Sequence, residues 1–193
     1  MLKYLFANSS AVRAKEIPDD AEVFTYHEKS AIQALLGGFM MAAFVEATVL
    51  HILLAYWNHW IALVATLSTV WVVFQIVAQI RAAAMRPVFI ADNKLVLRNG
   101  AFDLATIPLD RIATVDVTIH DPDYDDSEPK PLHVSFPASH SVVVTLTEPA
   151  QATILNRRQR DFQIALIAID DADRFATSIE THLQSRYAEA IVD

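Results

Sequence analysis

Residues 30–80 read SAIQALLGGFMMAAFVEATVLHILLAYWNHWIALVATLSTVWVVFQIVAQI, and this stretch decides the fold of the chain. It divides into two apolar runs. The first, residues 30–56, contains one charged side chain, Glu46, and the second, residues 60–80, contains none. The hydrocarbon core of a bilayer is about 30 Å thick and is crossed by roughly 20 helical residues, so each run is long enough to cross it. Only residues 57–59 separate the runs, which predicts a transmembrane helical hairpin with a tight turn.

The residues that flank the two runs predict the orientation of the hairpin. Aromatic side chains, which favour the membrane interface, cluster at the turn: Tyr56, Trp57 and Trp60. Lys29 precedes the first run, Arg81 and Arg86 follow the second, and the turn has no Lys or Arg. By the positive-inside rule we expect both termini in the cytoplasm, with the protein in a bacterial inner membrane.

Composition argues against several classes of function. The formal net charge is −8 and the isoelectric point about 5.3, so we expect no nucleic-acid partner. The chain has no cysteine and three glycines, which excludes thiolate metal sites and gives no glycine-rich phosphate loop. No two of the seven histidines have the spacing of a helical metal pair. We therefore predict no metal site, no cofactor, no catalytic residue and no enzymatic activity.

The chain after Arg86 changes to the alternating pattern of β-strands. Residues 87–102 predict two short strands joined at Asp92–Asn93, followed by a second turn at Asn99–Gly100. Runs rich in β-branched residues follow at 111–120, 140–147 and 162–170. We expect about seven strands in all.

The C-terminal part of the chain predicts one helix. Asp170 or Asp171 can cap its first turn, and Phe175, Ile179 and Leu183 recur at a spacing of four. The predicted fold is therefore α+β: a membrane hairpin and a small β-barrel or bent sheet, with the helix covering an open end.

The predicted boundaries follow from these patterns. They are an N-terminal cytoplasmic segment at 1–28, the hairpin at 29–82, and a cytoplasmic β domain at 86–188.

A resemblance to known proteins begins at RPVFIADNKLVLRNGAFDLATIPLDRIATVDV, residues 86–117. This stretch resembles bacterial pleckstrin-homology-like domains that are attached to membrane helices. The layout also resembles uncharacterised bacterial two-span membrane proteins, in which a Glu in the first span precedes a His, as Glu46 precedes His51. The resemblance covers roughly residues 39–180 and implies a pleckstrin-homology-like cytoplasmic domain.

Glu46 and His51 are the polar residues of the first run that raise a functional question. Five residues correspond to 500° of helix, so their side chains point about 140° apart and cannot hold one ligand together. Pairing the two helices around the turn places His51 level with Thr66, and Glu46 near Trp71 and within a turn of Gln75. Glu46 also continues a stripe of small residues at a spacing of four, a pattern typical of closely packed membrane helices: Ala34, Gly38 and Ala42.

Three interpretations of these residues remain open. They can form contacts within the hairpin or a homo-oligomer, they can bind a partner membrane protein, or they can handle protons or ions. The first two favour a membrane-anchored scaffold or assembly protein, with Ala34, Gly38, Ala42, Glu46, His51 and Gln75 at helix interfaces. The alternative is an oligomeric proton- or ion-coupled transport component that uses Glu46 and His51.

One dense basic cluster occurs in the predicted β domain. Arg157, Arg158 and Arg160 lie in the sequence NRRQRD, at a predicted hairpin tip. Basic side chains near an anionic leaflet gain about 1 kcal/mol each. We predict either an exposed hairpin end or a contact with anionic lipid or a partner protein.

Overall fold

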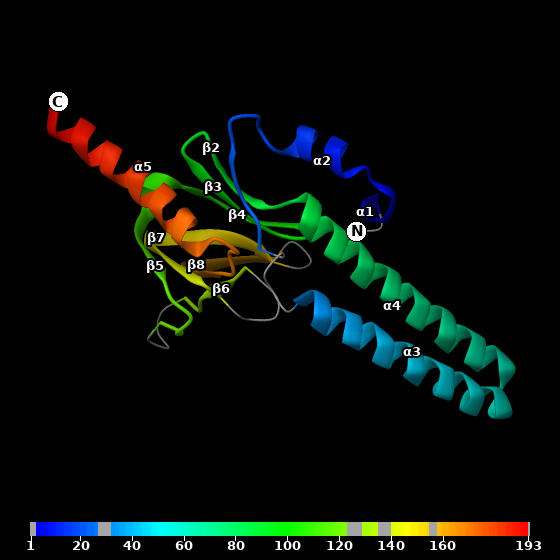
Figure 1. Cartoon of the computed structure of the whole chain (residues 1–193). Coiled ribbons are helices and arrows are strands. Elements are labelled where there is room, and N and C mark those ends of the chain that lie inside the picture. The colour runs from blue at the N-terminus through cyan, green and yellow to red at the C-terminus, as the bar shows by residue number, and fades with distance from the viewer. Residues whose placement is uncertain (1–2, 27–31, 123–128, 135–139, 155–157, 193) are drawn as a thin grey trace.

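The computed structural model describes residues 3–26, 32–122, 129–134, 140–154 and 158–192, without the side chains of residues 32–36 and 185–192. Within these residues the chain is an α+β protein. Two long helices form a hairpin that extends away from a domain of two β-sheets, and a C-terminal helix lies on the far side of that domain (Figure 1).

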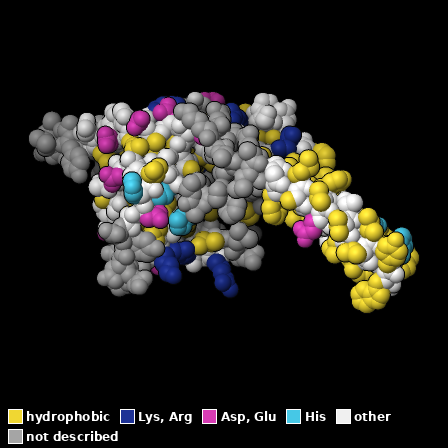
Figure 2. Space-filling view, turned by 60° about the horizontal axis from the view of Figure 1, so that its bottom comes forward, with side chains coloured by type: hydrophobic (Ala, Val, Ile, Leu, Met, Phe, Trp, Pro, Cys, Tyr) yellow, Lys and Arg dark blue, Asp and Glu magenta, His cyan; other side chains and the backbone are white. Residues whose placement is uncertain are grey.

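The hairpin consists of α3 (Ile32–Trp57) and α4 (His59–Met85). Asn58 alone separates them, and its side chain accepts hydrogen bonds from the backbone N–H groups of Trp60 (2.9 Å) and Ile61 (3.4 Å). This capping begins α4 directly after the turn. Both helices are long and apolar enough to cross a membrane, and hydrophobic side chains cover their outer surface (Figure 2).

The first sheet has four antiparallel strands in the order β1-β2-β3-β4. Their bounds are β1 (Glu22–Phe24), β2 (Val88–Ala91), β3 (Lys94–Asn99) and β4 (Phe102–Pro108). Asp92 (φ 50°) and Asn93 (φ 58°) join β2 to β3, and positive φ at both residues is what a type I′ hairpin turn requires. The predicted turn at Asp92–Asn93 is confirmed.

The second sheet has the order β5-β7-β8-β6, in which β6 is parallel to β8 and the other pairs are antiparallel. Its strands are β5 (Ile112–Val117), β6 (Leu132–His133), β7 (Val142–Ile154) and β8 (Arg158–Ile167), and a 3₁₀ turn, η1 (Leu109–Arg111), leads into β5. The two sheets do not join into a closed barrel within the described residues, so the barrel alternative was wrong.

One hydrophobic core unites both sheets and the C-terminal helix α5 (Ala172–Val192). Alternate residues of β7, such as Val142 and Val144, enter this core, as the period-two pattern predicts. Asp171 caps α5 by accepting a hydrogen bond from the Arg174 backbone N–H (3.5 Å). The ring of Phe175 then packs edge-on against Phe24 at 4.9 Å. The helix therefore covers the core at the end where β1 lies.

The N-terminal segment packs against α4 and contributes one strand to the first sheet. It forms α1 (Lys3–Phe6) and α2 (Ser9–Glu16), which lie beside the domain-proximal end of α4, and then β1, which pairs with β2 (Figure 1). Tyr4 packs with Ala82 and Met85 of α4. Segments on both sides of the hairpin in sequence therefore complete one folded unit.

Candidate functional site

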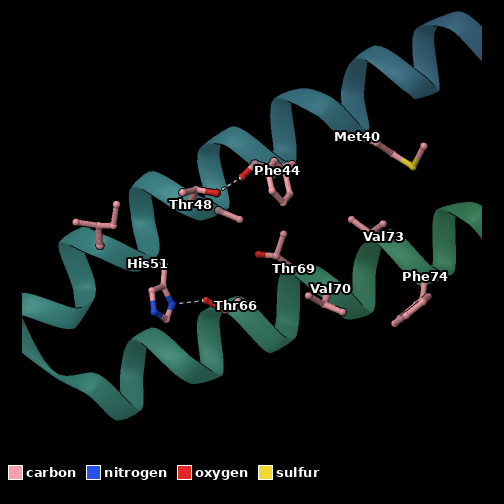
Figure 3. A pocket seen from close by; sticks show the side chains of 11 residues that line it. Met40, Phe44, Thr48, His51, Thr66, Thr69, Val70, Val73 and Phe74 are labelled. Atoms are coloured by element: carbon pink, nitrogen blue, oxygen red, sulfur yellow. Dashed lines mark hydrogen bonds between the residues drawn. The ribbon is translucent and has the colours of Figure 1, made fainter.

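A polar contact joins the two helices of the hairpin. His51 Nδ1 of α3 lies 2.7 Å from Thr66 Oγ1 of α4 (Figure 3). Thr66 Oγ1 also donates to the Ala62 carbonyl at 2.9 Å. Both contacts form at once when His51 carries its proton on Nδ1 and donates to Thr66, while the threonine hydroxyl donates to Ala62. The contact confirms the predicted level of His51 opposite Thr66.

Small side chains other than the predicted stripe line the interface between α3 and α4. On α3 the less exposed positions recur at a spacing of three and four: Met40, Ala43, Ala47, His51 and Leu54. On α4 they include Ala62, which is fully buried, and the partly buried Ala65, Thr66, Thr69 and Val73. Alanine on both helices, with threonine on α4, allows the helix backbones to approach closely.

The predicted stripe points away from α4. Gly38 has open space within 4 Å of where a Cβ would lie, and Ala42 and Glu46 are exposed. By helical geometry these positions lie roughly 100° to 180° from the α4-facing side of α3. The side chain of Ala34, the first member of the stripe, lies outside the described residues. The stripe is therefore an outer surface of the hairpin.

Glu46 and Gln75 do not pair. No hydrogen bond or ion pair joins Glu46 to any residue that the structure describes, and the buried Gln75 Oε1 has no described hydrogen-bond partner either. Glu46 and Gln75, which the sequence placed within one helical turn of each other, therefore form no hydrogen bond. His51 has a partner within the hairpin, whereas Glu46 lies outside it.

A groove of about 490 Å³ opens between the helices beside His51 (Figure 3). It is lined by Met40, Phe44, Ala47, Thr48, His51, Ile52, Thr66, Thr69, Val70, Val73 and Phe74. The hydroxyls of Thr48 and Thr69 donate to backbone carbonyls of their own helices. The groove is therefore almost entirely apolar and lacks the convergent charged groups that ion handling requires.

The contribution of the His51 contact can be measured by substitution. Thr66→Val removes the hydroxyl and keeps the shape, and we expect it to destabilise the hairpin by about 0.6 kcal/mol, the average for hydrogen bonds between membrane helices. Thr69→Val is the matched control, because Thr69 bonds only within α4. Unfolding of the purified protein in detergent measures both variants. Equal losses would show that the His51 contact adds no stability.

A second polar site joins α4 to the β domain. Arg86 directly follows α4, and 4% of it is exposed. Its guanidinium donates to Glu16 Oε2 (2.5 Å), Asp103 Oδ1 (2.6 Å) and the Gly100 carbonyl (3.2 Å). Arg98 donates to the same Asp103 oxygen at 3.0 Å. We name these four side chains, Glu16, Arg86, Arg98 and Asp103, the junction cluster.

The protonation states of the junction cluster follow from its hydrogen bonds. Burial alone would lower the pKa of Arg86, but the hydrogen bonds to Asp103 and Glu16 outweigh it and raise that pKa above its ordinary value. Burial would likewise raise the pKa of Asp103, but the hydrogen bond and charge of Arg86, together with Arg98, hold it below its ordinary value. Both groups therefore stay ionised at neutral pH.

Tyr26 and Gln79 extend the junction on either side of Gly100. The Tyr26 hydroxyl accepts a hydrogen bond from the Gly100 N–H at 2.8 Å, and burial raises the pKa of this phenol. The Gln79 side chain of α4 donates to the Asn99 carbonyl (3.1 Å) and accepts from the Ala101 N–H (3.2 Å). The last turns of α4 are thereby fixed to the β3–β4 turn.

No protein family, curated protein or solved structure matches the chain. The functional assignment therefore depends on the geometry of the hairpin, the junction cluster and the domain surface. In the described residues, no three His, Asp or Glu side chains are grouped as they are in metal sites.

The predicted basic tip is only partly available for binding. Arg160 donates to the carbonyls of Lys130 (2.7 Å) and Pro131 (3.4 Å), which ties it to the segment before β6. Arg158 is exposed at the start of β8, and Arg157 lies outside the described residues. The junction cluster could not be found from the sequence, because its members are far apart in the chain. Glu16 and Arg86, for example, are separated by 70 positions.

Proposed function

We propose that the protein is a membrane-anchored scaffold or assembly protein of the bacterial inner membrane. In this proposal α3 and α4 cross the membrane, both termini are cytoplasmic, and the two-sheet domain with α5 is pleckstrin-homology-like. The outer stripe of α3, with Gly38, Ala42 and Glu46, contacts a helix of a partner membrane protein or of a second copy.

The position of Glu46 carries the proposal. The His51–Thr66 contact places Glu46 at the level of Trp71, which is roughly 16 Å along α4 from the interfacial Trp60 at 1.5 Å per residue. That depth is near the middle of a bilayer about 30 Å thick. An acidic residue there costs about 2.5–3.5 kcal/mol on insertion scales unless a partner satisfies it. An exposed Glu46 without a described partner is therefore explained by an external one.

The junction supports the scaffold role. Because α4 passes without a break into Arg86 and the junction cluster, a helix bound to the hairpin would be held at a fixed orientation to the β domain. Arg158 offers a further exposed cation for a partner or an anionic lipid.

Association through the stripe can be tested in mild detergent with crosslinking. We expect the wild-type protein to crosslink as an oligomer or to a co-purifying membrane protein, and Ala42→Leu to abolish this by blocking close helix approach. Ala55→Leu is the matched control, since Ala55 is exposed on the same helix outside the stripe. A strictly monomeric wild-type protein with no co-purifying partner would refute the proposal.

Glu46→Gln separates scaffolding from the transport alternative. Glutamine keeps hydrogen-bonding capacity and removes titration. We expect the association and the cellular phenotype to survive this change. Loss of the phenotype with the association intact would favour proton or ion coupling instead.

A further inference from the structure

An open pocket of about 560 Å³ lies where α2 meets the base of α4. Its lining comes from both helices: Ser9, Ser10, Arg13, Arg81, Ala84 and Met85. The volume falls within the roughly 300–1,000 Å³ of ligand pockets. Two of its six lining residues are arginines, so its chemistry is that of an anion site.

Both arginines are held in place by backbone carbonyls. Arg13 Nη2 donates to the Ala84 carbonyl of α4 at 2.8 Å. Arg81 Nε and Nη2 donate to the carbonyls of Tyr4 (3.2 Å) and Ala7 (3.3 Å). These contacts fix the two guanidinium groups at the pocket and leave further N–H donors on each group for a ligand.

The positive charge of these arginines is not neutralised within the described part of the chain. Neither Arg13 nor Arg81 forms an ion pair with a described carboxylate, whereas Arg86, Arg98 and Arg174 each do. Both side chains are exposed, so their free N–H groups are open to an anion.

The pocket lies at the depth of lipid headgroups if the hairpin spans the membrane. Residues 60–80 of α4 carry no charge and match the roughly 20 residues of a bilayer core, and Arg81 is the first charged residue after them. Phe6, next to the Ala7 carbonyl that Arg81 binds, is 92% exposed. A large exposed ring beside cationic groups is typical of a surface at the membrane interface.

We propose that this pocket binds the phosphate of an anionic glycerophospholipid headgroup in the cytoplasmic leaflet. Arg13 and Arg81 would contact the phosphate oxygens, for which the planar guanidinium is well suited. Free inorganic phosphate shares this chemistry, but the exposed Phe6 ring and the exposed apolar surface of α4, which extends to Phe74, favour a ligand with acyl chains. The site differs from the Arg158 tip, and it rests on the proposed membrane hairpin.

The test uses the full-length protein in detergent. Native mass spectrometry measures binding of dioctanoyl phosphatidylglycerol against dioctanoyl phosphatidylcholine, with inorganic phosphate as a competitor. We expect the anionic lipid to be preferred. Arg13→Gln with Arg81→Gln should lower that preference roughly 30-fold, which corresponds to about 2 kcal/mol, and each single variant about fivefold. Arg111→Gln, which removes an exposed arginine of η1, should leave it unchanged.

Two results would overturn the proposal. An unchanged lipid preference in the double variant would show that these arginines do not bind the headgroup; if that variant does not fold, the single variants decide in the same way. Displacement of the lipid by an equal concentration of inorganic phosphate would assign the pocket to the free anion. The scaffold proposal would survive either result if the protein still forms the crosslinked species that Ala42→Leu abolishes.

Discussion

Replacing Arg86 with alanine is expected to lower the free energy of unfolding of the β domain by about 3 kcal/mol. The substitution removes hydrogen bonds to Glu16, Asp103 and the Gly100 carbonyl in one step. It also leaves the charge of Glu16, which is 25% exposed, without its closest partner. Urea unfolding in detergent, followed by far-UV circular dichroism, measures the loss.

Two further variants make the Arg86 prediction specific. Arg111→Ala removes an exposed arginine and should change stability by less than about 0.5 kcal/mol. Arg86→Lys keeps the charge but cannot reproduce the divergent guanidinium contacts, so it should lie between alanine and wild type. If Arg86→Ala were no more harmful than Arg111→Ala, the junction cluster would not hold the domain to α4.

Replacing Gly100 with alanine is the second large effect, at about 3 kcal/mol. Gly100 has φ +55°, a conformation that costs a residue with a Cβ roughly 1 kcal/mol. A Cβ there would also lie within 3.0 Å of the Gln79 side chain. Gln79 would have to move and lose its hydrogen bonds to Asn99 and Ala101, which are worth about 1 kcal/mol each.

The matched control is Gly37→Ala in α3. No atom lies within 4 Å of a Cβ built on Gly37, and alanine is the better helix former, so no loss of stability is expected. Thermal unfolding of the two glycine variants compares them directly. Equal behaviour would contradict a close contact between α4 and the β3–β4 turn.

The hairpin and most strands could be predicted from sequence because their signals are local. Each signal depends on residues that are close together in the chain. The examples are the apolar runs on either side of Asn58, the Asp92–Asn93 turn and the cap at Asp171. The level of His51 opposite Thr66 also follows from a local count, because the turn between the helices is so short.

Other features depend on contacts between distant segments and could not be predicted from the sequence. Strand β1 has three residues, too few for an alternating pattern. It is defined by its pairing with β2, which follows the hairpin in the chain. The sequence also left open which side of α3 faces α4. Two small-residue rows run along α3, and the row with Ala43 and Ala47 faces α4 while the row with Gly38 and Ala42 faces outward.

The outward row of α3 is the surface on which the proposed partner helix would bind. It places Glu46 on the surface of an apolar hairpin, and the junction cluster fixes that hairpin to the β domain. A partner helix at Glu46 and an anionic lipid at Arg13 and Arg81 would therefore act on one connected unit.

The central claim is that the hairpin crosses a membrane, with the N-terminal segment and the β domain together on one side. Because the chain has no cysteine, single cysteines at exposed positions can be labelled with a membrane-impermeant maleimide in intact spheroplasts. We expect His59→Cys, at the turn, to be labelled from outside. Lys15→Cys in α2 and Gln151→Cys in β7 should react only after lysis. Labelling of all three positions before lysis, or of none, would contradict the claim.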